Sequence, residues 1–113
     1  MSLGAGNRTS LSAPLVVVIG HERCGAVEAT LESIQHNSEP HGDMGALVEG
    51  ITPAVPVAEQ RRGDLVENTI RVNTEMSRDA IAKSSLLADR LKAGEVKVLA
   101  AYYSLDDGRV TQL

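Results

Sequence analysis

Two apolar runs stand out in the hydrophobic pattern of the chain. Residues 15–19, LVVVI, are aliphatic and mostly β-branched without alternation, which is typical of a strand buried on both faces of a parallel sheet. A second apolar run, 96–103, predicts another buried strand. Between the two runs, apolar residues recur every three or four positions, which indicates helices. We therefore expect an α/β fold in which helices flank a small, mixed and mainly parallel sheet.

Start and stop signals divide the helical part. A helical period begins at Cys24 and runs to about His36, where turn residues follow. Asp43 is placed to cap a short helix through Glu49. Pro53 and Pro56 are expected to close that segment, and 58–63 to form an exposed loop.

The next helix has a clear beginning. Asp64, with Glu67 three residues later, resembles a capping box, and Met76 is expected to fill the core along this helix. Ser84 and Ser85 are expected to interrupt the helix and to cap a second piece.

The two ends of the chain differ in character. Asp107-Gly108 predicts a turn that folds 109–113 back as an antiparallel edge strand. Residues 1–13 are rich in Gly, Ser, Thr and Asn without a period, so we expect a flexible lead there. Residues 14–113 are then a single, partial α/β domain.

The candidate chemistry lies where the first strand meets the first helix. His21 and Cys24 fall at the carboxyl end of a strand, where open α/β sheets place their ligands. The positive end of a helix dipole favours the thiolate, and a thiolate with an imidazole suits Zn²⁺. The alternative for the same spacing is a hydrogen-bonded turn histidine beside a small buried cysteine.

The string VVVIGHERCGAV, residues 16–27, closely resembles the second zinc motif of β-class carbonic anhydrases, G-H-x-x-C-G-A after a buried strand. The segment GDLVENTIRVNTEMS resembles the long helix of that family, and VKVLAAYYSLDDGRV resembles its G-A-Y-Y-D-L-x-x-G-x-V strand and hairpin. The resemblance covers 14–113 and implies that His21 and Cys24 bind zinc.

The other zinc motif of the family, C-x-D-x-R, does not occur in this chain, and Cys24 is the only cysteine. In the family, that motif supplies a third zinc ligand and an Asp–Arg pair that orients the zinc-bound hydroxide. Its strand lies in the centre of the sheet, beside the strand that matches 15–19. We therefore expect this chain to match the C-terminal part of the family's fold. His36, His41 and Asp43 are potential replacement ligands, although such loop side chains are ordinarily solvated.

Composition and charge limit the classes of molecule that this chain is expected to bind. The formal net charge is −4 and Lys and Arg form no run, which argues against nucleic acid. No stretch approaches the roughly 18 apolar residues of a membrane span. A single cysteine agrees with a reducing, cytoplasmic location.

The resemblance implies reversible hydration of CO₂ to bicarbonate on zinc, with no catalytic side chain assigned because the Asp–Arg pair is absent. The alternative is a catalytically inactive α/β assembly module with weak or no zinc binding. A third interpretation is an anion site at the helix N-terminus near Gly25. An exposed edge beside 15–19 further predicts a homodimer or higher homo-oligomer.

Overall fold

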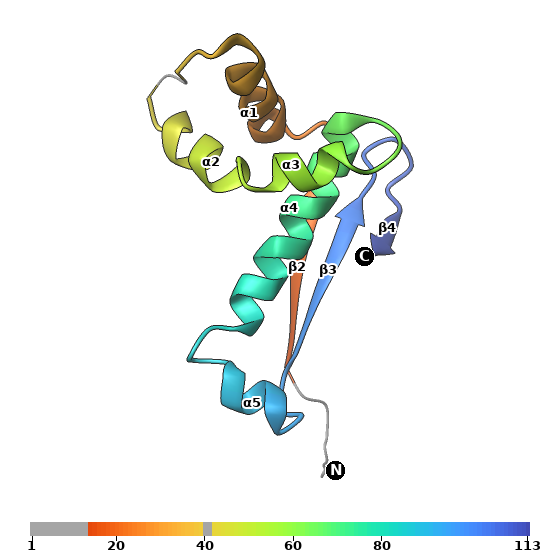
Figure 1. Ribbon diagram of the computed structural model, residues 1–113. Helices are drawn as coiled ribbons and strands as arrows, with labels where there is room; N and C mark the ends of the chain where they lie inside the picture. Colours follow the sequence, from red (N-terminus) through yellow and green to blue (C-terminus); the bar gives the residue numbers. More distant parts are fainter. Residues whose placement is uncertain (1–13, 40–41) are drawn as a thin grey trace.

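A computed structural model describes residues 14–39 and 42–113 (Figure 1). The expected lead at 1–13 and the candidate ligand His41 lie outside the described residues. The elements follow in the order β2 (Leu15–His21), α1 (Gly25–His36), α2 (Met44–Ile51), α3 (Ala54–Glu59), α4 (Leu65–Ala82), α5 (Ala88–Lys92), β3 (Lys97–Tyr103) and β4 (Val110–Gln112). This arrangement confirms the predicted α/β fold.

The described residues form a three-stranded mixed sheet in the order β2-β3-β4. β2 and β3 are parallel, with Leu15 opposite Lys97 and His21 opposite Tyr103. β4 is antiparallel to β3, as the Asp107-Gly108 turn predicts. Figure 1 shows α4 lying along β2 and β3, with α1 to α3 gathered at the carboxyl end of β2. Both parallel strands therefore end at the same edge of the sheet.

The prediction that β2 is buried on both faces is wrong. Leu15, Val17 and Ile19 are 56%, 41% and 57% exposed, whereas the residues between them are half-buried. Side chains alternate across a strand, so one face of β2 packs on α4 and the other does not. We call this second face the open face of the sheet, formed on β2 by Leu15, Val17, Ile19 and His21.

Gly20 lies inside β2, where the sequence predicts that the strand ends. A Cβ atom at this position would lie 2.2 Å from Thr74 Oγ1 and 3.1 Å from Ile70 Cγ2. Thr74 is buried and its hydroxyl donates to the Ile70 carbonyl at 2.7 Å, so it cannot move without losing that bond. Gly20 therefore permits the close approach of α4 to the strand.

Two clusters of buried side chains form the core. The larger joins α1, α2, α4 and β3 through Val27, Ile51, Ile70 and Tyr102. The smaller joins α3 to α4 through Ala54, Ala58 and Val72.

Helix α3 corrects two expectations for the middle of the chain. α2 ends at Ile51, before Pro53, as expected, but Pro56 does not close the segment, because it lies in the first turn of α3, where a proline removes only an N–H that has no partner within the helix. Ala58 is buried, and only the residues after α3 form the expected loop. Met76, expected in the core, is 40% exposed because the buried face of α4 runs through other positions.

The predicted helix boundaries are largely confirmed. The Asp64 carboxylate accepts the Glu67 N–H at 3.0 Å and so caps α4. α4 ends at Ala82, before the two serines, as expected, but neither serine caps α5: its N-cap is Leu87, and no side chain makes a capping hydrogen bond there. Asp43 stands at the start of α2, but its side chain makes no capping hydrogen bond, and α2 continues to Ile51.

Candidate metal centre

A tight turn connects β2 to α1 and carries both predicted zinc ligands. The Glu22 N–H donates to the Tyr103 carbonyl at 2.9 Å, which continues the pairing with β3. Arg23 adopts a left-handed conformation with φ 55°, which is uncommon for a residue other than glycine. Cys24 is the N-cap of α1, and its carbonyl accepts the Glu28 N–H at 3.1 Å. These hydrogen bonds and the left-handed residue together define the backbone conformation of the turn.

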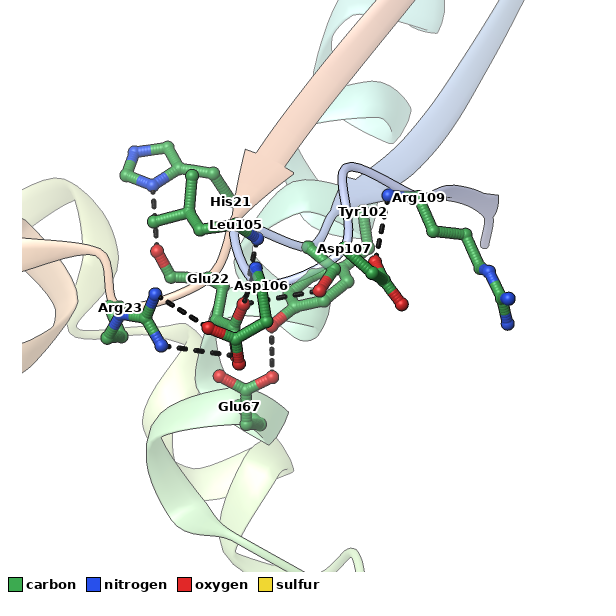
Figure 2. Close-up of polar contacts among 10 residues, drawn as sticks. His21, Glu22, Arg23, Glu67, Tyr102, Leu105, Asp106, Asp107 and Arg109 are labelled. Atoms are coloured by element: carbon green, nitrogen blue, oxygen red, sulfur yellow. Dashed lines mark hydrogen bonds and ion pairs between the residues drawn. The ribbon is translucent and has the colours of Figure 1, made fainter.

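His21 is exposed and belongs to the open face (Figure 2). Its Nδ1 lies 3.1 Å from the Glu22 carbonyl oxygen. A carbonyl can only accept a hydrogen bond, so this contact favours the tautomer with the proton on Nδ1, in which the lone pair lies on Nε2. Metal-binding histidines typically donate their other ring N–H in this way. His21 is thus in the form that a zinc ligand requires.

Cys24 is half-buried and has no disulfide partner. It packs against the cluster of Val27, Ile51, Ile70 and Tyr102, and its side chain makes no capping hydrogen bond. This packing agrees with the interpretation of Cys24 as a small core residue, while its partial exposure is compatible with a ligand. The structure thus places His21 and Cys24 at the two ends of one turn.

The other candidate ligands do not join this pair. Within 14–39 and 42–113, no group of three or more His, Cys, Asp or Glu side chains could hold a metal ion. His36 ends α1, roughly 18 Å along the helix axis from Cys24. Catalytic zinc sites generally use three protein ligands and a water. The imidazole and thiol therefore fit zinc as two ligands, and the described residues do not complete the coordination sphere.

A polar network ties the turn to the connection between β3 and β4 (Figure 2). One carboxylate oxygen of Glu22, Oε1, accepts hydrogen bonds from Ser104 Oγ at 3.2 Å, from the Leu105 N–H at 2.8 Å and from the Asp106 N–H at 3.2 Å. Arg23 Nη2 donates to Asp106 Oδ1 at 3.0 Å, and Arg23 Nη1 lies 3.6 Å from Glu22 Oε2. The network therefore joins the ends of two neighbouring parallel strands.

The charged pair in this network is exposed. The hydrogen bond to Asp106 raises the pKa of Arg23, and the same contact lowers the pKa of the Asp106 carboxyl. Solvent screens such surface pairs, so their contribution to stability is small. We conclude that Arg23 and Asp106 shape the turn more than they stabilise the fold.

A second polar contact lies beneath the turn. The Tyr102 hydroxyl donates to Glu67 Oε1, and the Arg71 guanidinium lies 4.4 Å from the centre of the Tyr102 ring. Burial, followed by the hydrogen bond to Glu67, raises the pKa of Tyr102. The capping-box pattern is thus only half realised, because the Glu67 side chain bonds to Tyr102 on β3. This contact and the Glu22 network were not predicted, since each joins residues far apart in the sequence.

Comparison with known proteins identifies the family. A family model described as carbonic anhydrase matches residues 8–110. The chain belongs to the carbonic anhydrase family, in its β class. It is 33% identical over 102 residues to carbonic anhydrase 2 of Mycobacterium tuberculosis. This alignment covers 89% of this chain and 49% of that protein. It is 34% identical over 104 residues to a carbonic anhydrase of Mycolicibacterium smegmatis, covering 90% of this chain and 50% of that protein.

The solved structures agree on the fold. One of two tetrameric β-carbonic anhydrases from the filamentous ascomycete Sordaria macrospora matches with a TM-score of 0.70 at 14% identity, covering 88% of this chain and 51% of that chain. The chain spans about half the length of the curated relatives that it matches. In the described part of this chain, no helix is both long and apolar enough to cross a membrane.

Proposed function

We propose that this chain carries two zinc ligands, His21 and Cys24, of a β-class carbonic anhydrase site that hydrates CO₂ reversibly to bicarbonate. The hydrogen bond from His21 Nδ1 to the Glu22 carbonyl is the observation that carries this proposal, because it leaves Nε2 free to bind a metal. The position of Cys24 at the start of α1, on the same turn, supports the pairing. Family membership supports zinc as the metal.

The chain's own residues account for one side of such a site. His21 offers Nε2, Cys24 offers Sγ, and the Glu22 peptide holds the imidazole ring. When bound, zinc supplies a Lewis acid that lowers the pKa of a bound water to about 7. Among the described residues, no further ligand joins this pair, and the C-x-D-x-R motif is absent from the sequence. We therefore propose that the chain alone has little or no CO₂ hydratase activity.

A second candidate function is an inactive α/β assembly module. The open face favours it, because Leu15, Val17 and Ile19 present an apolar row that is costly to leave in water. The edge of β2 also has unpaired backbone groups among the described residues. Both functions are compatible with a homodimer or higher homo-oligomer, and the Sordaria macrospora enzymes of the same fold are tetrameric.

Two further proposals concern organisation. We propose that 14–113 form one partial domain, which the cluster shared by α1, α2, α4 and β3 supports. We also propose a cytoplasmic location, which the unpaired thiol of Cys24 supports.

The ligand assignment can be tested by binding Co²⁺, which replaces Zn²⁺ and reports its ligands by absorption. The wild-type chain should show a thiolate-to-cobalt charge-transfer band that disappears in Cys24→Ala and weakens strongly in His21→Ala. His36→Ala is the matched control, because His36 is exposed at the far end of α1, and it should leave the spectrum unchanged. A spectrum unaffected by Cys24→Ala and His21→Ala would refute the assignment.

Activity tests whether the isolated chain completes the site. Stopped-flow CO₂ hydration with added zinc should remain near background for the isolated chain, because loss of a direct zinc ligand costs more than the tenfold to hundredfold that follows when a residue holding such a ligand is lost. A fast rate that falls to background in Cys24→Ala would contradict this expectation and exclude the inactive module.

A further inference from the structure

The orientation of His21 depends on the peptide of the next residue. We propose that Glu22 is a positioning residue, whose carboxylate anchors the turn so that its own main-chain carbonyl holds the His21 ring with Nε2 free. This inference rests on the proposed role of His21 as a zinc ligand, but its structural part can be tested without metal.

The Glu22 residue is fixed through three different groups. Its N–H donates to the Tyr103 carbonyl at 2.9 Å. Its carbonyl accepts the Nδ1–H of His21 at 3.1 Å. Its carboxylate binds the turn after β3, so the residue whose carbonyl orients the imidazole is held by contacts of both its N–H and its side chain.

The carboxylate contact is concentrated on one oxygen. Glu22 Oε1 accepts from Ser104, Leu105 and Asp106, two of them through backbone N–H groups that a turn leaves without other partners. The Glu22 side chain is 18% exposed, far less than that of its neighbour Arg23 at 56%. Charge-assisted hydrogen bonds of this kind are stronger than neutral ones. The Glu22 carboxylate therefore fixes a solvent-exposed turn that would otherwise be mobile.

Arg23 forms a second link between the His21–Cys24 turn and the turn after β3. Its left-handed backbone turns the chain between His21 and Cys24, and its guanidinium pairs with Asp106 in the turn that Glu22 binds. Without the carboxylate of Glu22, the three donors of the connection after β3 would lose the acceptor described for them. The His21–Cys24 turn would then keep only the Glu22 N–H contact with Tyr103 and the Arg23–Asp106 pair as links to this region. The carbonyl of Glu22 would then no longer be held against the imidazole.

For this role, the side chain at position 22 must be long enough to reach the turn after β3 and must carry an oxygen that accepts hydrogen bonds. Glu22→Gln keeps the length and a carbonyl oxygen that can accept from the same donors. Glu22→Asp keeps the charge but is one methylene shorter, so it should fail to reach the turn. Comparison of these two variants separates positioning from a general effect of charge, and Glu22→Ala removes both features.

The test is the imidazole tautomer of His21 in the zinc-free full chain, read from its ¹⁵N NMR shifts. His21→Ala identifies the resonance. The wild type and Glu22→Gln should show mainly the Nδ1–H form. Glu22→Asp and Glu22→Ala should shift toward the Nε2–H form that free imidazole side chains prefer, while circular dichroism shows that the fold is retained. If Glu22→Ala fails to fold, Glu22→Asp and Glu22→Gln still give the decisive pair.

A second readout is zinc affinity by calorimetry. Glu22→Asp should weaken binding about tenfold to a hundredfold, and Glu22→Gln should stay close to wild type. Glu28→Gln, at an exposed acidic residue of α1, is the matched control and should have no effect. A tautomer that is the same in all Glu22 variants would overturn the positioning role even where zinc binds. Absence of zinc binding with the tautomer shift intact would instead refute the proposed function and leave the positioning role standing.

Discussion

The two faces of the β2–β3 pair differ in how completely the described chain covers them. On the face toward α4, Gly20 sits against Thr74, and Tyr102 bonds to Glu67, so strand and helix fit at close range. On the open face, Ile19 and its neighbours are exposed, and His21 belongs to the same row. The closed face holds the fold together, whereas the open face carries His21, one of the two proposed zinc ligands.

This difference relates stability to function. Contacts on the closed face are buried and specific, so changes there should lower the free energy of unfolding. Side chains on the open face make few contacts within the described residues, so changes there should alter association and metal binding with little effect on folding.

The largest effect is expected from Gly20→Ala. The new Cβ would meet Thr74 Oγ1 at 2.2 Å and force apart β2 and α4, which should lower the free energy of unfolding by about 1–3 kcal/mol. Gly50→Ala is the control, because a Cβ in α2 meets nothing within 4 Å. Urea denaturation should show Gly50→Ala unchanged or stabilised by up to about 1 kcal/mol. Equal stability of Gly20→Ala and wild type would show that α4 does not pack on β2 as described.

Two neighbouring tyrosines provide the next comparison. Tyr102 is 5% exposed on the closed face, and Tyr103 is 37% exposed on the open face. Tyr102→Phe removes the hydrogen bond to the Glu67 carboxylate and should cost about 1–2 kcal/mol. Tyr103→Phe should change stability by less than about 0.5 kcal/mol. Urea denaturation of both variants tests this prediction. Equal losses in the free energy of unfolding would contradict the placement of the two tyrosines on opposite faces of the sheet.

The raised pKa of Tyr102 predicts an alkaline loss of stability. Burial and Glu67 favour the neutral phenol in the folded state, so the unfolded chain releases the Tyr102 proton at a lower pH than the folded chain. This contribution to stability is fully present below the ordinary tyrosine pKa of about 10 and falls as pH rises above it. Thermal unfolding followed across this range should show a decline that is reduced in Tyr102→Phe. A decline of the same size in that variant would assign it to other groups.

The smallest effect on folding is expected on the open face. Ile19→Lys should change the stability of the monomer by less than about 0.5 kcal/mol, because Ile19 is 57% exposed. It should, however, reduce self-association measured by size exclusion with light scattering. Met76→Lys, at an exposed apolar position of α4, is the control and should leave association unchanged. A wild-type chain that is monomeric at micromolar concentration would contradict the proposed oligomer.

The sequence predicted the local features well. The strand, the turn with His21 and Cys24 and the following helix are all readable from adjacent residues, as are the Asp64 cap and the Asp107-Gly108 turn. Each depends on backbone geometry within a few positions, where propensity and capping chemistry act directly.

The remaining features depend on distant residues. An apolar run such as 15–19 indicates a strand but not which face lacks a partner, so the exposure of Ile19 was not predicted. The Glu22 anchor joins residues 82 to 84 positions apart, and no local pattern marks such a contact. α3 was missed because Pro56 is a breaker in most helical positions but not in the first turn.

The most direct test of the incomplete site is the zinc content of the purified chain after dialysis against a weak chelator. Because the described residues bring together only two proposed ligands rather than three, elemental analysis should give well below one zinc per chain. Cys24→Ala should remove what remains, and His36→Ala should not. One zinc per chain in the wild type would contradict the account, since it would require a further ligand that completes the site on the open face.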